Sequence, residues 1–146
     1  METENKKINN HCPNKIAHLA MIQGVIDRMG GNLFYLKGWS ITLLAGLFAI
    51  STSGTLSLSE WSTALLIVLL LLFWIFDGYF LSLERCFRDL YDQVRKMDEE
   101  DIDFSMNIGE FTKLRNRSPL NTMFRPTLVG FYGAILISMV IIIKLI

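Results

Sequence analysis

Apolar residues recur at alternating spacings of three and four along residues 61–97, and no proline interrupts them. They are Leu66, Leu69, Phe73, Phe76, Phe80, Leu83, Phe87, Leu90, Val94 and Met97. This heptad spacing is typical of a helix that packs along a second helix. The pattern continues from an apolar first half into a charged second half. It predicts one continuous helix over 61–98, roughly 55 Å long at ~1.5 Å per residue. Such a helix crosses a ~30 Å bilayer core and continues into water.

A second heptad pattern predicts another long helix over residues 15–53. Its members are Leu19, Ile22, Ile26, Met29, Leu33, Leu36, Ser40, Leu43, Leu47 and Ile50. Residues 38–53 are apolar enough to enter a membrane, and Lys37 and Trp39 mark the inner edge of that span. Three glycines interrupt the part expected in water, either to let helices pack closely or to form a hinge: Gly24, Gly30 and Gly31.

Residues 54–60 form a short predicted turn, so the two helices should lie antiparallel as a hairpin, 15–98, with spans 38–53 and 61–83. Positions in such a hairpin are level where their residue numbers add to about 114, because both helices rise equally per residue. This predicts two ion pairs, Lys37 with Asp77 and Arg28 with Glu84. Asp77 should lie in the inner margin of the membrane.

Two interpretations of this acidic residue stay open. In one, Asp77 is a carboxylate that is merely paired with Lys37. In the other, the pair lines and gates a pore, with Phe73 and Phe76 beside it on the helix.

Residues 99–126 are expected to form a cytosolic linker after the acid run Asp98–Asp101 ends the second helix. Within the linker, Ile102, Phe104, Met106 and Ile108 alternate with polar residues, which predicts a short strand in need of a partner. Residues 127–146 form a third apolar span of about 20 residues, the length a bilayer requires. Small residues occupy every fourth position of this span: Gly130, Ala134 and Ser138.

Half of the chain is hydrophobic, in blocks, so the fold class expected is an all-α membrane protein with three transmembrane helices. The net charge is zero, yet every Lys and Arg except Lys144 lies before the first span or between the second and third. This places the N-terminus in the cytoplasm and the C-terminus outside. Residues 1–14 are expected to be a disordered tail, in which His11 and Cys12 show no metal-ligand spacing. No catalytic motif is present, so neither an enzyme, a cofactor nor a metal is expected.

Three segments carry a family resemblance: HLAMIQGVIDRMGGNLFYLKGW (18–39), FWIFDGYFLSLERCFRDLYDQVR (73–95) and MFRPTLVGFYGAIL (123–136). They resemble the small membrane effectors of bacterial anti-phage defence operons, most of all those of the Hailong system. The positions that carry the resemblance are Arg28, Lys37, Asp77, Glu84, Arg85 and Arg88. The resemblance implies a homo-oligomeric channel of the inner membrane, a tetramer. DNA oligomers made by a partner nucleotidyltransferase would hold it closed, and its release would depolarise the infected cell.

A single-stranded DNA oligomer needs basic side chains with aromatic surfaces nearby. The linker offers four bases for the first contacts: Lys113, Arg115, Arg117 and Arg125. Arg88 and Arg95 are second choices, since acidic neighbours one helical turn away weaken their field. The alternative is that these bases only fix topology. For the whole protein, the alternative to a channel is a non-conducting scaffold that anchors a cytosolic partner.

Overall fold

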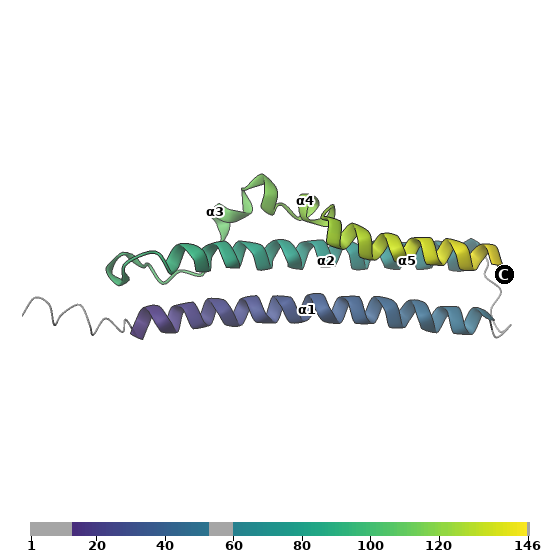
Figure 1. Cartoon of the computed structure of the whole chain (residues 1–146), viewed down its shortest axis with the longest axis horizontal. Helices are drawn as coiled ribbons and strands as arrows, with labels where there is room; N and C mark the ends of the chain where they lie inside the picture. Colours follow the sequence, from purple (N-terminus) through teal and green to yellow (C-terminus); the bar gives the residue numbers. More distant parts are fainter. Residues whose placement is uncertain (1–12, 53–59, 146) are drawn as a thin grey trace, which may run out of the picture.

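The computed structural model describes residues 13–52 and 60–145, and these are arranged around two long helices (Figure 1). Helix α1 spans Pro13–Thr52 and helix α2 spans Glu60–Val94. Short elements follow in the order η1 (Glu99–Asp101), α3 (Gly109–Thr112), η2 (Arg115–Arg117) and α4 (Pro119–Met123). Helix α5, Pro126–Leu145, ends the described chain. Nearly all of the predicted turn and of the predicted tail lies outside the described residues, and Glu60, the last residue of the predicted turn, begins α2.

Helices α1 and α2 lie side by side and run in opposite directions (Figure 1). Both are continuous, without a break near residue 37 or residue 78, as the heptad patterns predicted. Among the described residues, these two helices are long and apolar enough to cross a membrane, and α5 holds a shorter apolar stretch, Pro126–Ile141. Helix α5 lies along the first half of α2, with the C-terminus near the start of α2 (Figure 1).

Helix α2 ends at Val94, four residues before the predicted end, because the acid run that follows suits the start of a helix better than its end. Three of these acids fill the first turn of η1 instead. The Glu99 carboxylate accepts a hydrogen bond from the backbone N–H of Lys15, at 3.3 Å, and the Lys15 ammonium donates to the carbonyl of Met97. The acid run therefore caps the first turn of α1, whose amides have no partner within the helix.

The strand predicted for residues 102–108 is wrong: this segment has no regular structure, and the described ranges contain no strand at all. Its polar side chains bond to the backbone two residues further on, in Asx- and Ser-type turns. The Asp103 carboxylate accepts a hydrogen bond from the amide of Ser105. The Ser105 hydroxyl accepts one from the amide of Asn107, and the Asn107 side chain accepts one from the amide of Gly109. The alternation of polar residues reflects these local turns rather than two faces of a strand.

Phe104, in the middle of this segment, has a φ of 53°, in the left-handed region that no strand residue adopts. Its ring packs edge-on against His18 of α1, with 5.5 Å between the centroids. Neighbouring apolar residues still reach the core between α1 and α2, where Ile102 packs with Ile22 and Leu90. The segment therefore closes the end of the helix pair without forming a strand.

A second core lies between α2 and α5 and is built around Leu70, Leu128 and Tyr132. Helix α2 therefore has two packing faces, one for α1 and one for α4 and α5. This differs from the single heptad face predicted: Phe76 is 51% exposed, whereas Asp77 and Gly78 are buried. Phe73 is partly buried and packs against the second core.

Candidate functional site

Charged and polar side chains from α1, α2 and α5 meet at Asp77. The Lys37 ammonium lies 2.6 Å from Asp77 Oδ2, and the Tyr132 hydroxyl lies 3.2 Å from the same oxygen. The Asp77 carboxylate and Tyr132 are fully buried, while the Lys37 side chain is 30% exposed. The predicted ion pair is confirmed, and Tyr132 joins it as a third member.

Aromatic rings hold the tyrosine in place. The Trp74 ring stacks on Tyr132 with 6.0 Å between the centroids, and Phe131 packs against it edge-on at 5.1 Å. The indole N–H of Trp74 donates a 3.0 Å hydrogen bond to the carbonyl of Met123, which ties α4 to the same group. The face of the Phe131 ring lies 5.8 Å from the Lys37 nitrogen, which adds a cation–π contact. This geometry fixes both partners of the carboxylate.

One oxygen of Asp77 carries the whole network. Oδ2 accepts from both Lys37 and Tyr132, whereas the buried Oδ1 has no hydrogen-bond partner among the described residues. A buried charge is costly unless it is compensated, and the Lys37 ammonium supplies that compensation for Asp77. The arrangement can therefore act as an electrostatic latch between helices.

The predicted pair of Arg28 with Glu84 is not formed. Glu84 pairs instead with Arg88, one turn further along α2, at 2.6 Å. The level of Arg28 was predicted well, but its direction was not: it lies two residues, about 200° of helix, from the buried Ile26 and is exposed. A position on the correct level can thus face away from the partner helix.

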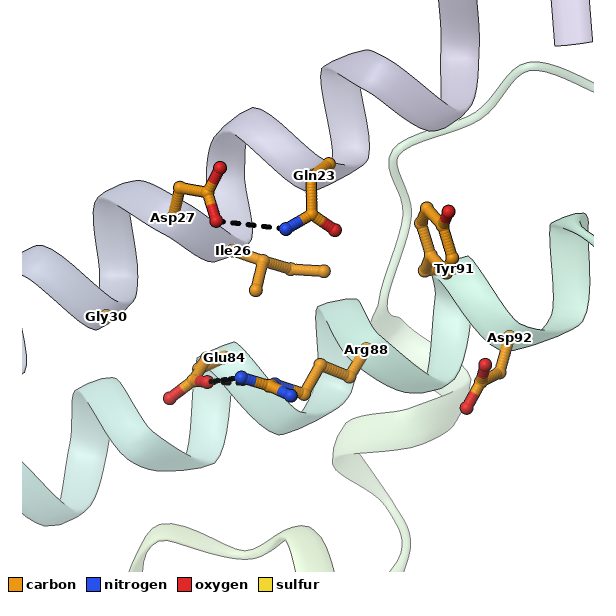
Figure 2. Close-up of a pocket in the computed structure, with 8 residues that line it drawn as sticks. All are labelled: Gln23, Ile26, Asp27, Gly30, Glu84, Arg88, Tyr91 and Asp92. Atoms are coloured by element: carbon orange, nitrogen blue, oxygen red, sulfur yellow. Dashed lines mark hydrogen bonds and ion pairs between the residues drawn. The ribbon is translucent and has the colours of Figure 1, made fainter. Parts of the chain in front are cut away.

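A cavity of about 420 Å³ lies between the first half of α1 and the second half of α2 (Figure 2). Its α1 wall holds a Gln23–Asp27 hydrogen bond of 2.9 Å, and its α2 wall holds the Glu84–Arg88 pair. Gly30 leaves part of the space open, since a Cβ atom there would meet nothing within 4 Å. The same is true at Gly24 and Gly31, so close helix packing does not account for these three glycines within one chain.

Three of the six predicted ligand bases are engaged within the chain. Arg117 donates two hydrogen bonds to the Asp89 carboxylate, one of 2.7 Å from Nη2 and one from Nε. These bonds raise the pKa of Arg117. Arg88 is bound to Glu84, and Arg95 lies 3.2 Å from Asp92. The remaining three are exposed and form no ion pair with any described residue: Lys113, Arg115 and Arg125.

Arg85 belongs to this basic region as well, although the linker bases were predicted as first contacts. Its Nη1 atom is buried and has no hydrogen-bond partner in the described part of the chain. Burial lowers the pKa of Arg85, and the nearby charges of Arg125 and Arg117 lower it further, against the opposing effects of Asp89 and Glu84. Arg85 and Arg125 are therefore close enough for their charges to interact, and neither forms an ion pair with an acid in the described part of the chain.

Sequence reasoning missed Tyr132 and Trp74 as parts of the site. A tyrosine in an otherwise apolar span is a signal, because a buried hydroxyl requires a partner. His, Cys, Asp and Glu side chains form no group of three or more suited to a metal ion within residues 13–52 and 60–145.

Comparison with known proteins adds no further constraint on the site. No protein family, no curated protein and no solved structure matches the chain. The role of the network around Asp77 and of the basic residues is therefore inferred from their geometry and from the sequence.

Proposed function

We propose that the protein is a membrane protein with three spans, in α1, α2 and α5, and a cytoplasmic extension of the α1–α2 pair. Large apolar side chains on these helices face outward, among them Ile41, Val68 and Ile137. Lipid or further copies of the chain would cover them, since such an apolar surface is costly in water. The distribution of Lys and Arg supports a cytoplasmic N-terminus and an outer C-terminus in the inner membrane of a bacterium.

We further propose that several copies, four by the resemblance, assemble into an ion-conducting pore whose state depends on the network around Asp77. The observation that carries this proposal is the buried Lys37–Asp77–Tyr132 network, which joins α1, α2 and α5. On the proposed topology, this network lies near the inner membrane edge. A protein that only anchors a partner needs no buried charge between its spans. Ionisable groups inside a membrane usually mark a functional site. In the proposed mechanism, the intact network keeps the helices together and the pore closed, and separation of α5 from Asp77 opens it.

The proposed signal is a single-stranded DNA oligomer made by a partner nucleotidyltransferase, and it keeps the pore closed. Lys113 and Arg115 are the best candidates for its first contacts, because both are exposed and neither is paired with a described acid. Arg117 is a weaker candidate than the sequence indicated, since its guanidinium is held by Asp89. An assembly of several protein copies would repeat Lys113 and Arg115 around one axis. The repetition would strengthen the weak positive electrostatic field of each copy. Opening of the pore would depolarise the cell and stop phage production.

Planar-bilayer recording of the purified protein, with and without a DNA oligomer on the cytoplasmic side, tests the proposal. We expect conductance that the oligomer suppresses. In the double variant Lys113→Glu/Arg115→Glu, oligomer affinity should collapse and its salt dependence should weaken, because fewer phosphates are neutralised.

The matched control is Arg28→Glu/Lys96→Glu, which makes the same charge change at two exposed positions elsewhere on the cytosolic surface. Unchanged oligomer binding in the Lys113/Arg115 variant would refute the contact assignment. Absence of any conductance from correctly inserted protein would refute the pore and favour the scaffold that anchors a cytosolic partner.

A further inference from the structure

Helix α4 buries a polar side chain and exposes apolar ones, the reverse of a helix that faces water. Thr122 is fully buried, and its hydroxyl donates a 2.9 Å hydrogen bond to the carbonyl of Ser118. Leu120 and, just after the helix, Phe124 are each 68% exposed. Such a surface suits an apolar surrounding rather than the cytosol.

The position of α4 along α2 indicates which surrounding this is. The Met123 carbonyl is bound to the Trp74 indole, and the Phe124 ring packs edge-on to Trp74 with 5.9 Å between the centroids. A Cβ atom on Gly78 would overlap the Met123 side chain, so α4 lies directly against α2 at this level. On the proposed topology, this level is the inner margin of the membrane, where Asp77 also lies. Leu120 and Phe124 are thus placed to enter the cytoplasmic leaflet.

Uncompensated positive charge lies beside this apolar surface, slightly nearer the cytosol. The buried Nη1 atom of Arg85 has no partner among the residues described, and burial together with Arg125 and Arg117 lowers the pKa of Arg85. Two acids act on Arg85, and both are engaged elsewhere: Asp89 is bound by both its oxygens to Arg117, and Glu84 is paired with Arg88. A partly desolvated guanidinium requires an anion, and bidentate binding of a phosphate by arginine would supply it.

We propose that Arg85 and Arg125 bind the phosphate of an anionic phospholipid in the cytoplasmic leaflet, while Leu120 and Phe124 insert among its acyl chains. The inference rests on the membrane topology of the proposed function but requires no conductance. A lipid is favoured over a nucleic acid because the same short segment carries exposed apolar side chains at the depth of the membrane margin. Arg125 is thereby assigned to lipid, and Lys113 and Arg115 remain for the DNA oligomer.

Fluorescence quenching by brominated lipids tests the proposal on the full-length chain. In a Trp39→Phe/Trp61→Phe background, Trp74 is the remaining tryptophan and lies beside Phe124. The protein is reconstituted in vesicles of phosphatidylcholine that contain either brominated phosphatidylglycerol or brominated phosphatidylcholine. We expect the anionic lipid to be preferred by roughly fivefold for each engaged base.

Arg125→Gln should lower the preference for the anionic lipid roughly fivefold. It should not affect folding, because this side chain is exposed. Arg85→Gln/Arg125→Gln should remove the preference altogether, and Arg28→Gln/Lys96→Gln is the control with the same loss of charge. Equal quenching by the two lipids in the parent, or a preference in Arg125→Gln as large as that of the parent, would overturn the proposal.

Added competitors distinguish the possible sources of the phosphate. Inorganic phosphate at millimolar concentration should leave the lipid preference unchanged, because it lacks acyl chains. Displacement of the lipid by inorganic phosphate would refute the lipid assignment in favour of a free-anion site. Displacement of the lipid by a DNA oligomer would refute the lipid assignment and place Arg125 in the nucleic-acid site. Lipid preference without conductance would refute only the pore, and conductance without lipid preference would refute only this inference.

Discussion

Replacement of Asp77 by asparagine tests the network that joins the three long helices. The change keeps the size of the side chain and an acceptor for the Tyr132 hydroxyl, but it removes the charge that compensates Lys37. Loss of one partner costs ~3–5 kcal/mol for a fully buried pair and ~0.2–1 kcal/mol for an exposed one. The Asp77 side chain is 0% exposed and Lys37 30%, so this pair lies between the two limits. We expect a loss of about 2 kcal/mol, close to a 30-fold change in the folded-to-unfolded ratio.

The assay is chemical unfolding of the purified protein in detergent, with planar-bilayer conductance measured on the same preparations. Asp27→Asn is the matched control, since Asp27 is exposed and bonded only to the Gln23 side chain among described residues. It should change stability by less than about 0.5 kcal/mol.

A double-mutant cycle with Lys37→Met isolates the interaction of the pair. If the charges interact as the geometry indicates, Lys37→Met/Asp77→Asn should be less destabilised than the sum of the single variants. Additive effects, or an Asp77→Asn protein as stable as the control with unchanged conductance, would show that the pair is not a latch.

Two further variants probe how the linker is held against α2. Asp89→Ala leaves Arg117 without its two hydrogen bonds and should reduce the free energy of unfolding by about 1–3 kcal/mol, measured by chemical unfolding. Gly78→Ala places a Cβ atom in the Met123 side chain and should cost a similar ~1–3 kcal/mol through displacement of α4. Limited proteolysis after residue 112 should speed up in both variants, because the linker is then less firmly attached.

Each of these variants has a matched control on the same chain. Asp92→Ala removes a carboxylate whose pair with Arg95 is more than half exposed on both sides, so a change of less than about 1 kcal/mol is expected. Gly24→Ala places its Cβ where nothing lies within 4 Å and should stabilise the helix by about 1 kcal/mol. Equal effects of a variant and its control would contradict the corresponding contact.

The two long helices and the Lys37–Asp77 pair could be predicted because both follow from local rules. Heptad spacing indicates which stretches are helical, and equal rise per residue sets which positions are level in an antiparallel pair. The same rule put Arg28 and Glu84 on one level but could not show that Arg28 faces away from α2. The direction of a side chain depends on which face of α1 is buried. The sum of two residue numbers gives only their level along the hairpin.

The third member of the network could not be derived in the same way. Which residue of α5 reaches Asp77 depends on the path of the chain through residues 95–125, and that path has no periodic pattern. The bond between Arg117 and Asp89 depends on the same path. The alternation of apolar and polar residues at 102–108 fits the pattern of a strand. In the structure, the polar side chains instead bond to backbone amides two residues further on and form local turns.

The capping of α1 by Glu99 has a mechanical consequence. Polar bonds tie α1 to other described parts of the chain at Lys15 and at Lys37, and these two points are separated by roughly 33 Å of helix at ~1.5 Å per residue. Sliding α1 along α2 would disrupt the bonds at both points at once, so the pair resists shear and behaves as a stiff lever. Helix α5 is joined to this lever at Asp77 by one hydrogen bond from Tyr132 and by ring contacts. A swing of α5 about the turn at residues 124–125 would therefore have to break that bond and separate Leu128 and Tyr132 from Leu70 of α2.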